Sequence, residues 1–179
     1  MMQKLFWLQY NMKKPLIALI GNPNSGKTAI FNLLTGLSQK VSNYPGITID
    51  KKNGSVSHHK TQFDLLDLPG TYSITPETID EQIVSEQILA WIHNPQLRPN
   101  AIVSVIDASN LSRNLFLTSQ IAELGIPIII ALNMMDRVKA KNEDINMDAL
   151  KKLFNAVAVV PMSAVKKMGV SALKDEICN

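Results

Sequence analysis

The sequence has 179 residues, 46% of them hydrophobic and 18% charged, which predicts one folded domain and excludes a disordered chain. The net charge of +3 comes from scattered lysines and argues only weakly for nucleic acid, so no nucleic-acid partner is expected. The single cysteine, Cys178, excludes an internal disulfide. No apolar run reaches the roughly 18–20 residues that cross a bilayer, so we expect a soluble, cytoplasmic piece. Residues 1–13 are expected to form a tail and 14–179 the domain; oligomerisation leaves no signature in the sequence.

Short apolar runs alternate with helical patterns along the chain. This alternation predicts a mostly parallel sheet of six strands with helices on both faces. Five runs are apolar on both sides, as buried parallel strands are: 16–20, 63–66, 101–106, 127–132 and 157–160. Segment 51–57 alternates more and predicts one antiparallel edge strand, followed by a turn. Helices are expected at 27–34, 80–92, 111–124, 147–154 and 170–177.

The segment from Gly21 to Thr28 fits G-x-x-x-x-G-K-[ST] between the first strand and the first helix. In this context the pattern predicts a P-loop, in which successive backbone amides and the helix N-terminus bind phosphate. Lys27 is expected to reach the β- and γ-phosphates, and the Thr28 hydroxyl to ligate Mg²⁺. The nucleotide contacts of this loop are expected from Asn22, Pro23, Asn24, Ser25, Gly26, Lys27, Thr28 and Ala29.

Asp67 and Gly70 form an Asp-x-x-Gly segment at the end of the third strand. The carboxylate can hold Mg²⁺ through water, and the Gly70 amide can donate to a γ-phosphate because glycine permits close backbone approach. An Asp-x-x-Gly segment alone is a common turn. Its position one strand after the P-loop is what favours a role in binding phosphate and Mg²⁺.

The segment Asn133-Met134-Met135-Asp136 follows a strongly apolar strand and is a candidate base loop that includes Met134. The Asp136 carboxylate only accepts hydrogen bonds, which matches the N1–H and N2–H₂ donors of guanine that adenine lacks. Asn133 is expected to brace this loop against the P-loop, and Ser163-Ala164 to supply an amide to guanine O6. These loops all follow strands, so the site is expected along the carboxyl edge of the sheet.

Thr48 lies in the polar stretch 41–50 and is the candidate switch threonine. Its hydroxyl would complete the Mg²⁺ shell and its amide would contact the γ-phosphate, so the loop orders only with a triphosphate. Gly46 and Ile47 are expected to line the nucleotide beside it. Other threonines that composition alone allows are Thr35, Thr61 and Thr71.

These motifs together resemble the cytosolic G domain of the ferrous iron transport protein B (FeoB) family, a class of P-loop GTPases. The family-specific stretches are Asn-Tyr-Pro-Gly-Ile-Thr at 43–48 and Asp-Leu-Pro-Gly-Thr-Tyr-Ser at 67–73. The resemblance covers about residues 14–177. It implies a GTP- and GDP-binding switch domain attached to a membrane permease, at the cytoplasmic face of the bacterial inner membrane. That permease moves ferrous iron, and the helical and membrane domains that follow the G domain in the family are absent from this chain.

The resemblance also implies roles in hydrolysis for Lys27, Thr48, Gly70 and Asn24. Asn24 matches a P-loop asparagine that binds K⁺ in potassium-stimulated GTPases, although an asparagine is also a common turn residue. Thr71 stands where small signalling GTPases carry a glutamine that orients water, so intrinsic hydrolysis is expected to be slow.

Three other functions compete with this interpretation. A ribosome-assembly or tRNA-modifying GTPase would need an RNA-binding module or a basic stripe, and neither is visible. A non-catalytic module would use the nucleotide only as a switch. In an ATP-dependent kinase, residues 133–136 would have no function.

Arg113 is expected on a helix surface, with an in-cis catalytic role as the alternative. His58 and His59 are expected to form a solvated turn and not an iron site, because neighbours on a strand point to opposite faces.

Overall fold

The computed structural model describes residues 14–36, 39–44 and 49–179. The strands are β1 (Leu16–Gly21), β2 (Gln39–Asn43), β3 (Asp50–His58), β4 (Thr61–Asp67), β5 (Ala101–Asp107), β6 (Ile128–Asn133) and β7 (Ala158–Pro161). The α-helices are α2 (Lys27–Thr35), α3 (Ile79–His93), α4 (Leu111–Ala122), α5 (Met135–Ala140), α6 (Met147–Leu153) and α7 (Val170–Cys178). Two 3₁₀ turns, η1 (Pro95–Leu97) and η2 (Ala108–Asn110), flank β5. The expected tail at residues 1–13 lies outside the described residues.

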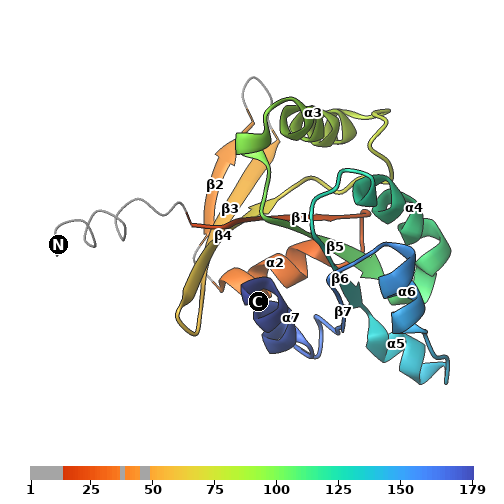
Figure 1. Ribbon diagram of the computed structural model, residues 1–179. Coiled ribbons are helices and arrows are strands. Elements are labelled where there is room, and N and C mark those ends of the chain that lie inside the picture. Colours follow the sequence, from red (N-terminus) through yellow and green to blue (C-terminus); the bar gives the residue numbers. More distant parts are fainter. Residues whose placement is uncertain (1–13, 37–38, 45–48) are drawn as a thin grey trace.

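Within the described residues the strands form one sheet in the order β2-β3-β4-β1-β5-β6-β7 (Figure 1). The five strands from β4 to β7 are parallel neighbours, whereas β3 runs antiparallel to both β2 and β4. The predicted α/β class, with a mostly parallel sheet covered by helices, is confirmed.

The sheet has seven strands in place of the predicted six, because Gln39–Asn43 forms β2 at the edge. This strand begins in a region predicted as loop, and it makes β3 an interior strand where an edge strand was expected. The sequence of β2 is Gln-Lys-Val-Ser-Asn, and its one apolar residue, Val41, is 54% exposed. A strand without a buried face leaves no hydrophobic alternation to detect, which is why the pattern missed it. The short helix α5 was missed as well.

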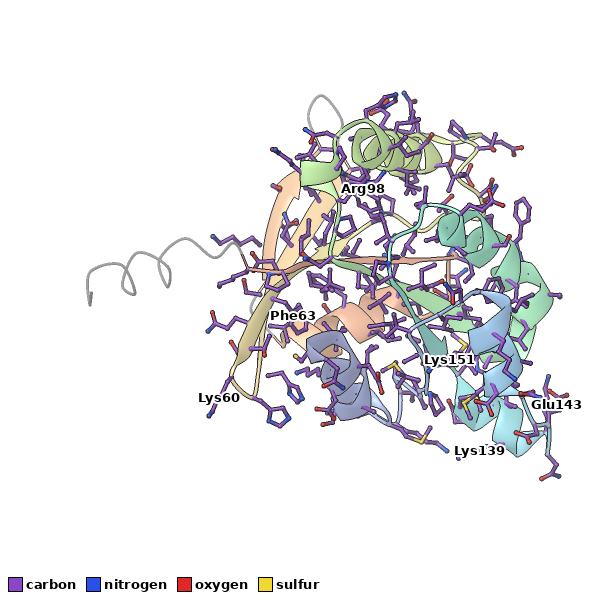
Figure 2. The ribbon with its side chains drawn as sticks, viewed as in Figure 1. Lys60, Phe63, Arg98, Lys139, Glu143 and Lys151 are labelled. Atoms are coloured by element: carbon purple, nitrogen blue, oxygen red, sulfur yellow. The ribbon has the colours of Figure 1, made fainter. Side chains whose placement is uncertain are left out.

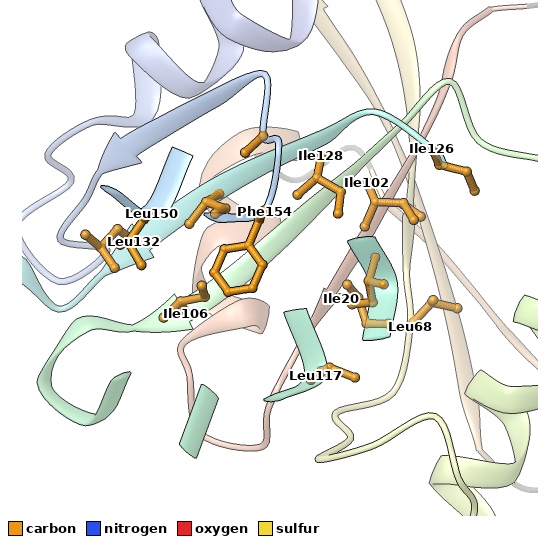
Figure 3. Packing of buried hydrophobic residues seen from close by; sticks show 14 of the residues in the cluster. Ile20, Leu68, Ile102, Ile106, Leu117, Ile126, Ile128, Leu132, Leu150 and Phe154 are labelled. Carbon is orange, nitrogen blue, oxygen red and sulfur yellow. The ribbon is translucent and has the colours of Figure 1, made fainter. Parts of the chain in front are cut away.

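Two hydrophobic clusters lie on opposite faces of the sheet. Alternate residues of one strand supply both, since Ala18 and Ile20 of β1 face one cluster and Ile17 and Leu19 face the other. The first cluster packs beneath α3, α4 and α6, and the second beneath α2 and α7 (Figure 1). Figure 3 shows side chains from β5, β6, α4 and α6 interdigitating in the first cluster. Figure 2 shows Phe63 of β4 inside the protein, where it joins the second cluster.

Among the described residues, no helix combines the length and the apolar character that a membrane span requires.

Adjacent residues of α4 give a sharp test of the packing. Leu117 is 1% exposed inside the first cluster, whereas Phe116 is 57% exposed. Leu117→Ala should lower the free energy of unfolding by about 2–5 kcal/mol, because it removes buried methyl groups and leaves a cavity. Phe116→Ala, the control, should change it by less than about 0.5 kcal/mol. Urea denaturation of both variants measures the difference, and equal losses would contradict the assigned faces of α4.

Candidate functional site

The predicted P-loop lies at the carboxyl end of β1, between the sheet and α2. Asn24 and Gly26 both have positive φ, at 66° and 88°, and these two left-handed residues curl the loop around its own amides. The Ser25 amide donates to the Asn22 carbonyl at 3.1 Å, which closes the turn. The loop lines a cavity of about 430 Å³, into which the exposed Thr28 also opens. Sequence reasoning therefore placed this loop correctly.

Asp67 ends β4, the parallel neighbour of β1, and its carboxylate accepts a hydrogen bond from Lys27 Nζ. Both side chains are buried, so each charge is balanced by the other. A second cavity of about 330 Å³ opens beside this pair and shares Thr28 and Gly70 with the first. Lys27, Thr28 and Gly70 thus line both cavities, and Asp67 lines the second.

Gly70 packs directly against the P-loop. A Cβ built on Gly70 would lie 3.2 Å from Pro23 Cα, a tight contact that a larger residue could make only if the P-loop backbone shifted. The next amide, that of Thr71, donates to the Gly21 carbonyl at 3.2 Å. The segment after β4 is thereby held at the mouth of the cavity.

Thr71 does not face the cavity with its hydroxyl. It is fully buried, and its Oγ1 donates to the Ser73 carbonyl and to Glu81 of α3. Glu81 also forms a capping box with Thr78. The hydrogen bond from the Glu77 amide, followed by those from the Tyr72 amide, Thr71 and Thr78, lowers the pKa of the Glu81 carboxyl. The site where other GTPases carry a water-orienting glutamine is therefore occupied by a structural hydroxyl.

Asn133, at the end of β6, joins two distant loops. Its Nδ2 donates to the Ser25 carbonyl at 2.9 Å, and its Oδ1 accepts from the Ala164 amide at 3.0 Å. The expected bracing of the base loop against the P-loop is present. Ser163-Ala164 was expected to supply an amide to guanine O6; in this structure the Ala164 amide donates to Asn133 and the Ser163 amide donates to the Met168 carbonyl at 3.2 Å.

Asp136 lies in the first turn of α5, next to the buried Ser163. A hydrogen bond from the Ser163 hydroxyl is the main cause that lowers the pKa of Asp136, and Lys166 and Arg137 lower it further. The half-exposed carboxylate is therefore ionised at neutral pH and acts as an acceptor. Met134, just before it, adopts φ 62°, which turns the chain from β6 into α5.

Two residues that sequence reasoning missed also reach this region. Asp80, in the first turn of α3, lines both cavities. Tyr44 is buried, and desolvation together with the charge of Asp67 raises its pKa to about 12. The capping pattern locates the start of α3, but only the path of the chain from 68 to 78 brings Asp80 to the cavity.

Gly46, Ile47 and Thr48 lie outside the described residues, so their contacts stay predictions.

The donor set fits a nucleotide and its metal. Asn22 Oδ1 and Ser25 Oγ are buried and have no hydrogen-bond partner among the described residues, as expected of groups in a ligand cradle. Thr28 and Asp67 offer the hard oxygen ligands that Mg²⁺ prefers. Arg113, the alternative catalytic residue, lies with its guanidinium 4.2 Å from the ring centre of Tyr72, while its carbonyl accepts from Asn22.

Comparison with solved structures supports the same arrangement. An S. thermophilus NFeoB mutant bound to mGDP matches with a TM-score of 0.82 and 42% identity, over 92% of this chain and 60% of that one. The FeoB G-domain from Methanococcus jannaschii matches with a TM-score of 0.76 and 42% identity, over 93% and 97% of the two chains. The cytosolic domain of T. maritima FeoB in a GDP form gives 0.84 and 34%, over 93% and 63%.

Sequence comparison agrees. The Fe(2+) transporter FeoB of Escherichia coli (strain K12) is 46% identical over 167 residues, which are 91% of this chain but 21% of the transporter. The chain thus spans about a fifth of the length of the curated relatives it matches. The family model described as ferrous iron transport protein B matches residues 15–177. The chain therefore belongs to the ferrous iron transport protein B family and comprises its P-loop G domain.

Proposed function

We propose that this chain binds GTP and GDP with Mg²⁺ and hydrolyses GTP slowly, as a switch for a ferrous-iron permease on the same longer polypeptide. The observation that carries the proposal is the Asn133 side chain, which fixes the phosphate loop and the base loop relative to each other. A site that holds a triphosphate and a purine together needs this fixed spacing. Two relatives, the cytosolic domain of T. maritima FeoB in a GDP form and the Fe(2+) transporter of Escherichia coli, support the nucleotide and the transport context.

Phosphate recognition rests on Lys27, the amides of 22–28 and the Gly70 amide. The Thr28 hydroxyl and, through water, the Asp67 carboxylate would hold Mg²⁺, which neutralises charge on the β- and γ-phosphates when bound. Water attacks the γ-phosphorus and the bond to the β–γ bridging oxygen breaks, which gives GDP and inorganic phosphate. Lys27 and the amides stabilise the negative charge in the transition state.

Hydrolysis is slow in this proposal because the Thr71 hydroxyl is engaged with Ser73 and Glu81. No side chain at that position orients the attacking water. Asn24 is exposed at the cavity, where its amide oxygen can ligate K⁺. A monovalent cation there supplies the charge that an arginine finger gives other GTPases.

Nucleotide competition on the wild type and Asp136→Asn tests the base site. The substitution should weaken GDP binding by about 10- to 100-fold, because hydrogen bonds to a charged acceptor contribute about 1.5–3 kcal/mol. The new amide donates to a 2-oxo group, so xanthine nucleotides should compete better. Since the pKa of Asp136 is lowered, its ionised form persists as pH falls, and the wild-type guanine preference should be flat from pH about 5 to 8.

Asp148→Asn provides the matched control, since Asp148 is an exposed aspartate in the first turn of α6. It should leave all nucleotide affinities unchanged. A guanine preference that survives Asp136→Asn would remove the proposed base site.

Single-turnover phosphate release with K⁺ or Na⁺ tests hydrolysis and the cation. We expect K⁺ to accelerate release in the wild type, and Asn24→Gly to remove that acceleration, a loss of about 10²-fold. Glycine is chosen because it accepts the φ of 66° at Asn24 without strain. Asn142→Gly changes another asparagine with positive φ, at 55°, and should have no effect.

Two outcomes would count against this mechanism. K⁺ stimulation that persists in Asn24→Gly would place the cation elsewhere. Absence of phosphate release from the wild type in either salt would leave a nucleotide switch without catalysis.

A further inference from the structure

The turn between β3 and β4 brings two adjacent histidines to the same carboxylate. His58 Nε2 lies 2.6 Å from Asp175 Oδ1, and His59 Nε2 lies 3.2 Å from the same oxygen. The expectation that these neighbours point to opposite faces is wrong, because His59 has left the strand with φ 50°. The two imidazole rings therefore lie side by side, with centroids 4.1 Å apart.

The three ligand atoms of this cluster lie within 4.8 Å of one another. Around a common ion with bonds of about 2.1 Å, such atoms are separated by about 3.0–3.4 Å. The His59–Asp175 distance lies in this range and the His58–Asp175 distance is shorter, so an ion would have to spread these ligands slightly. Two imidazole nitrogens and one carboxylate oxygen form a donor set that suits Fe²⁺ to Zn²⁺ and not Mg²⁺.

Rigid elements that are remote in sequence hold the ligands in place. His58 ends the nine-residue β3, Asp175 lies on the nine-residue α7, and these two elements are in contact. Leu173 anchors α7 in the second hydrophobic cluster, two residues before Asp175. Figure 1 shows the hairpin end beside α7, and Figure 2 places Lys60 at the hairpin tip.

Exposure of the three side chains suits the entry and retention of an ion. His58 is 15% exposed, Asp175 47% and His59 75%. One ligand is thus shielded while another faces water, and open coordination positions can be filled by solvent.

We propose that His58, His59 and Asp175 bind one divalent first-row transition-metal ion, which ties the β3–β4 hairpin to α7. This site is separate from the proposed nucleotide site and needs no nucleotide. An ion pair between protonated imidazoles and the carboxylate is the competing explanation, and it predicts no metal binding.

Calorimetric titration of Zn²⁺, and of Fe²⁺ without oxygen, into the whole chain free of nucleotide tests the proposal. We expect one ion per chain, with binding that survives excess Mg²⁺. His59→Gln and Asp175→Asn should each weaken binding by about tenfold or more, since even changes to residues behind the ligands cost 10- to 100-fold. The double variant His58→Gln/His59→Gln should bind no Zn²⁺.

Two controls separate this cluster from other donors of the chain. His93 is the third histidine of the sequence, and its Nδ1 lies 2.8 Å from the Leu89 carbonyl oxygen. His93→Gln should keep wild-type Zn²⁺ affinity. Cys178, a half-buried thiol one turn beyond Asp175, should likewise be dispensable in Cys178→Ser.

The melting temperature gives a second readout, because an ion that binds only the folded chain stabilises it. Zn²⁺ should raise the melting temperature of the wild type and not that of the double histidine variant. Equal Zn²⁺ affinity in those two proteins, or no binding to the wild type, would overturn the proposal. GTP hydrolysis by the double variant should match the wild type. A failure of the metal-site proposal can therefore be distinguished from a failure of the proposed function.

Discussion

The site depends first on one buried amide. Asn133 is 2% exposed, and both ends of its side chain are committed, the nitrogen to the P-loop and the oxygen to the loop after β7. A buried amide is costly unless it is hydrogen-bonded, so these loops must stay together for the fold to remain stable. In the proposed function, nucleotide recognition is thereby linked to folding, because one side chain fixes the distance between the phosphate loop and the base loop.

The Lys27–Asp67 pair shows how such a site can take up a ligand without a large change of buried charge. Lys27 and Asp67 neutralise each other across β1 and β4. A nucleotide with its metal brings one negative and one positive partner to the same place, so each residue can exchange its partner for another of the same sign. The Lys27 and Asp67 side chains are thus already largely removed from water before a ligand binds, which is a form of preorganisation.

The parallel half of the sheet and the positions of the loops at 21–28 and 133–136 could be predicted because their signals are local. Doubly apolar runs predict β1, β5 and β6, and each motif follows one such run. The edge strand β2 could not be predicted, since its polar residues bury no face. The position of Asp80 at the cavity and the assembly of the His58–His59–Asp175 cluster depend on contacts between residues far apart in sequence. The cluster also depends on the positive φ of His59, which no sequence period encodes.

Strand β3 runs from the cavity beside Lys27 to helix α7. Asp50 at its start lines the cavity beside Lys27, and His58 at its end lies against α7. The nine residues extend roughly 25–30 Å; β2 pairs with residues 50–54 and β4 with residues 52–58. The cavity beside Lys27 and the His58–His59–Asp175 cluster therefore lie at opposite ends of one continuous strand.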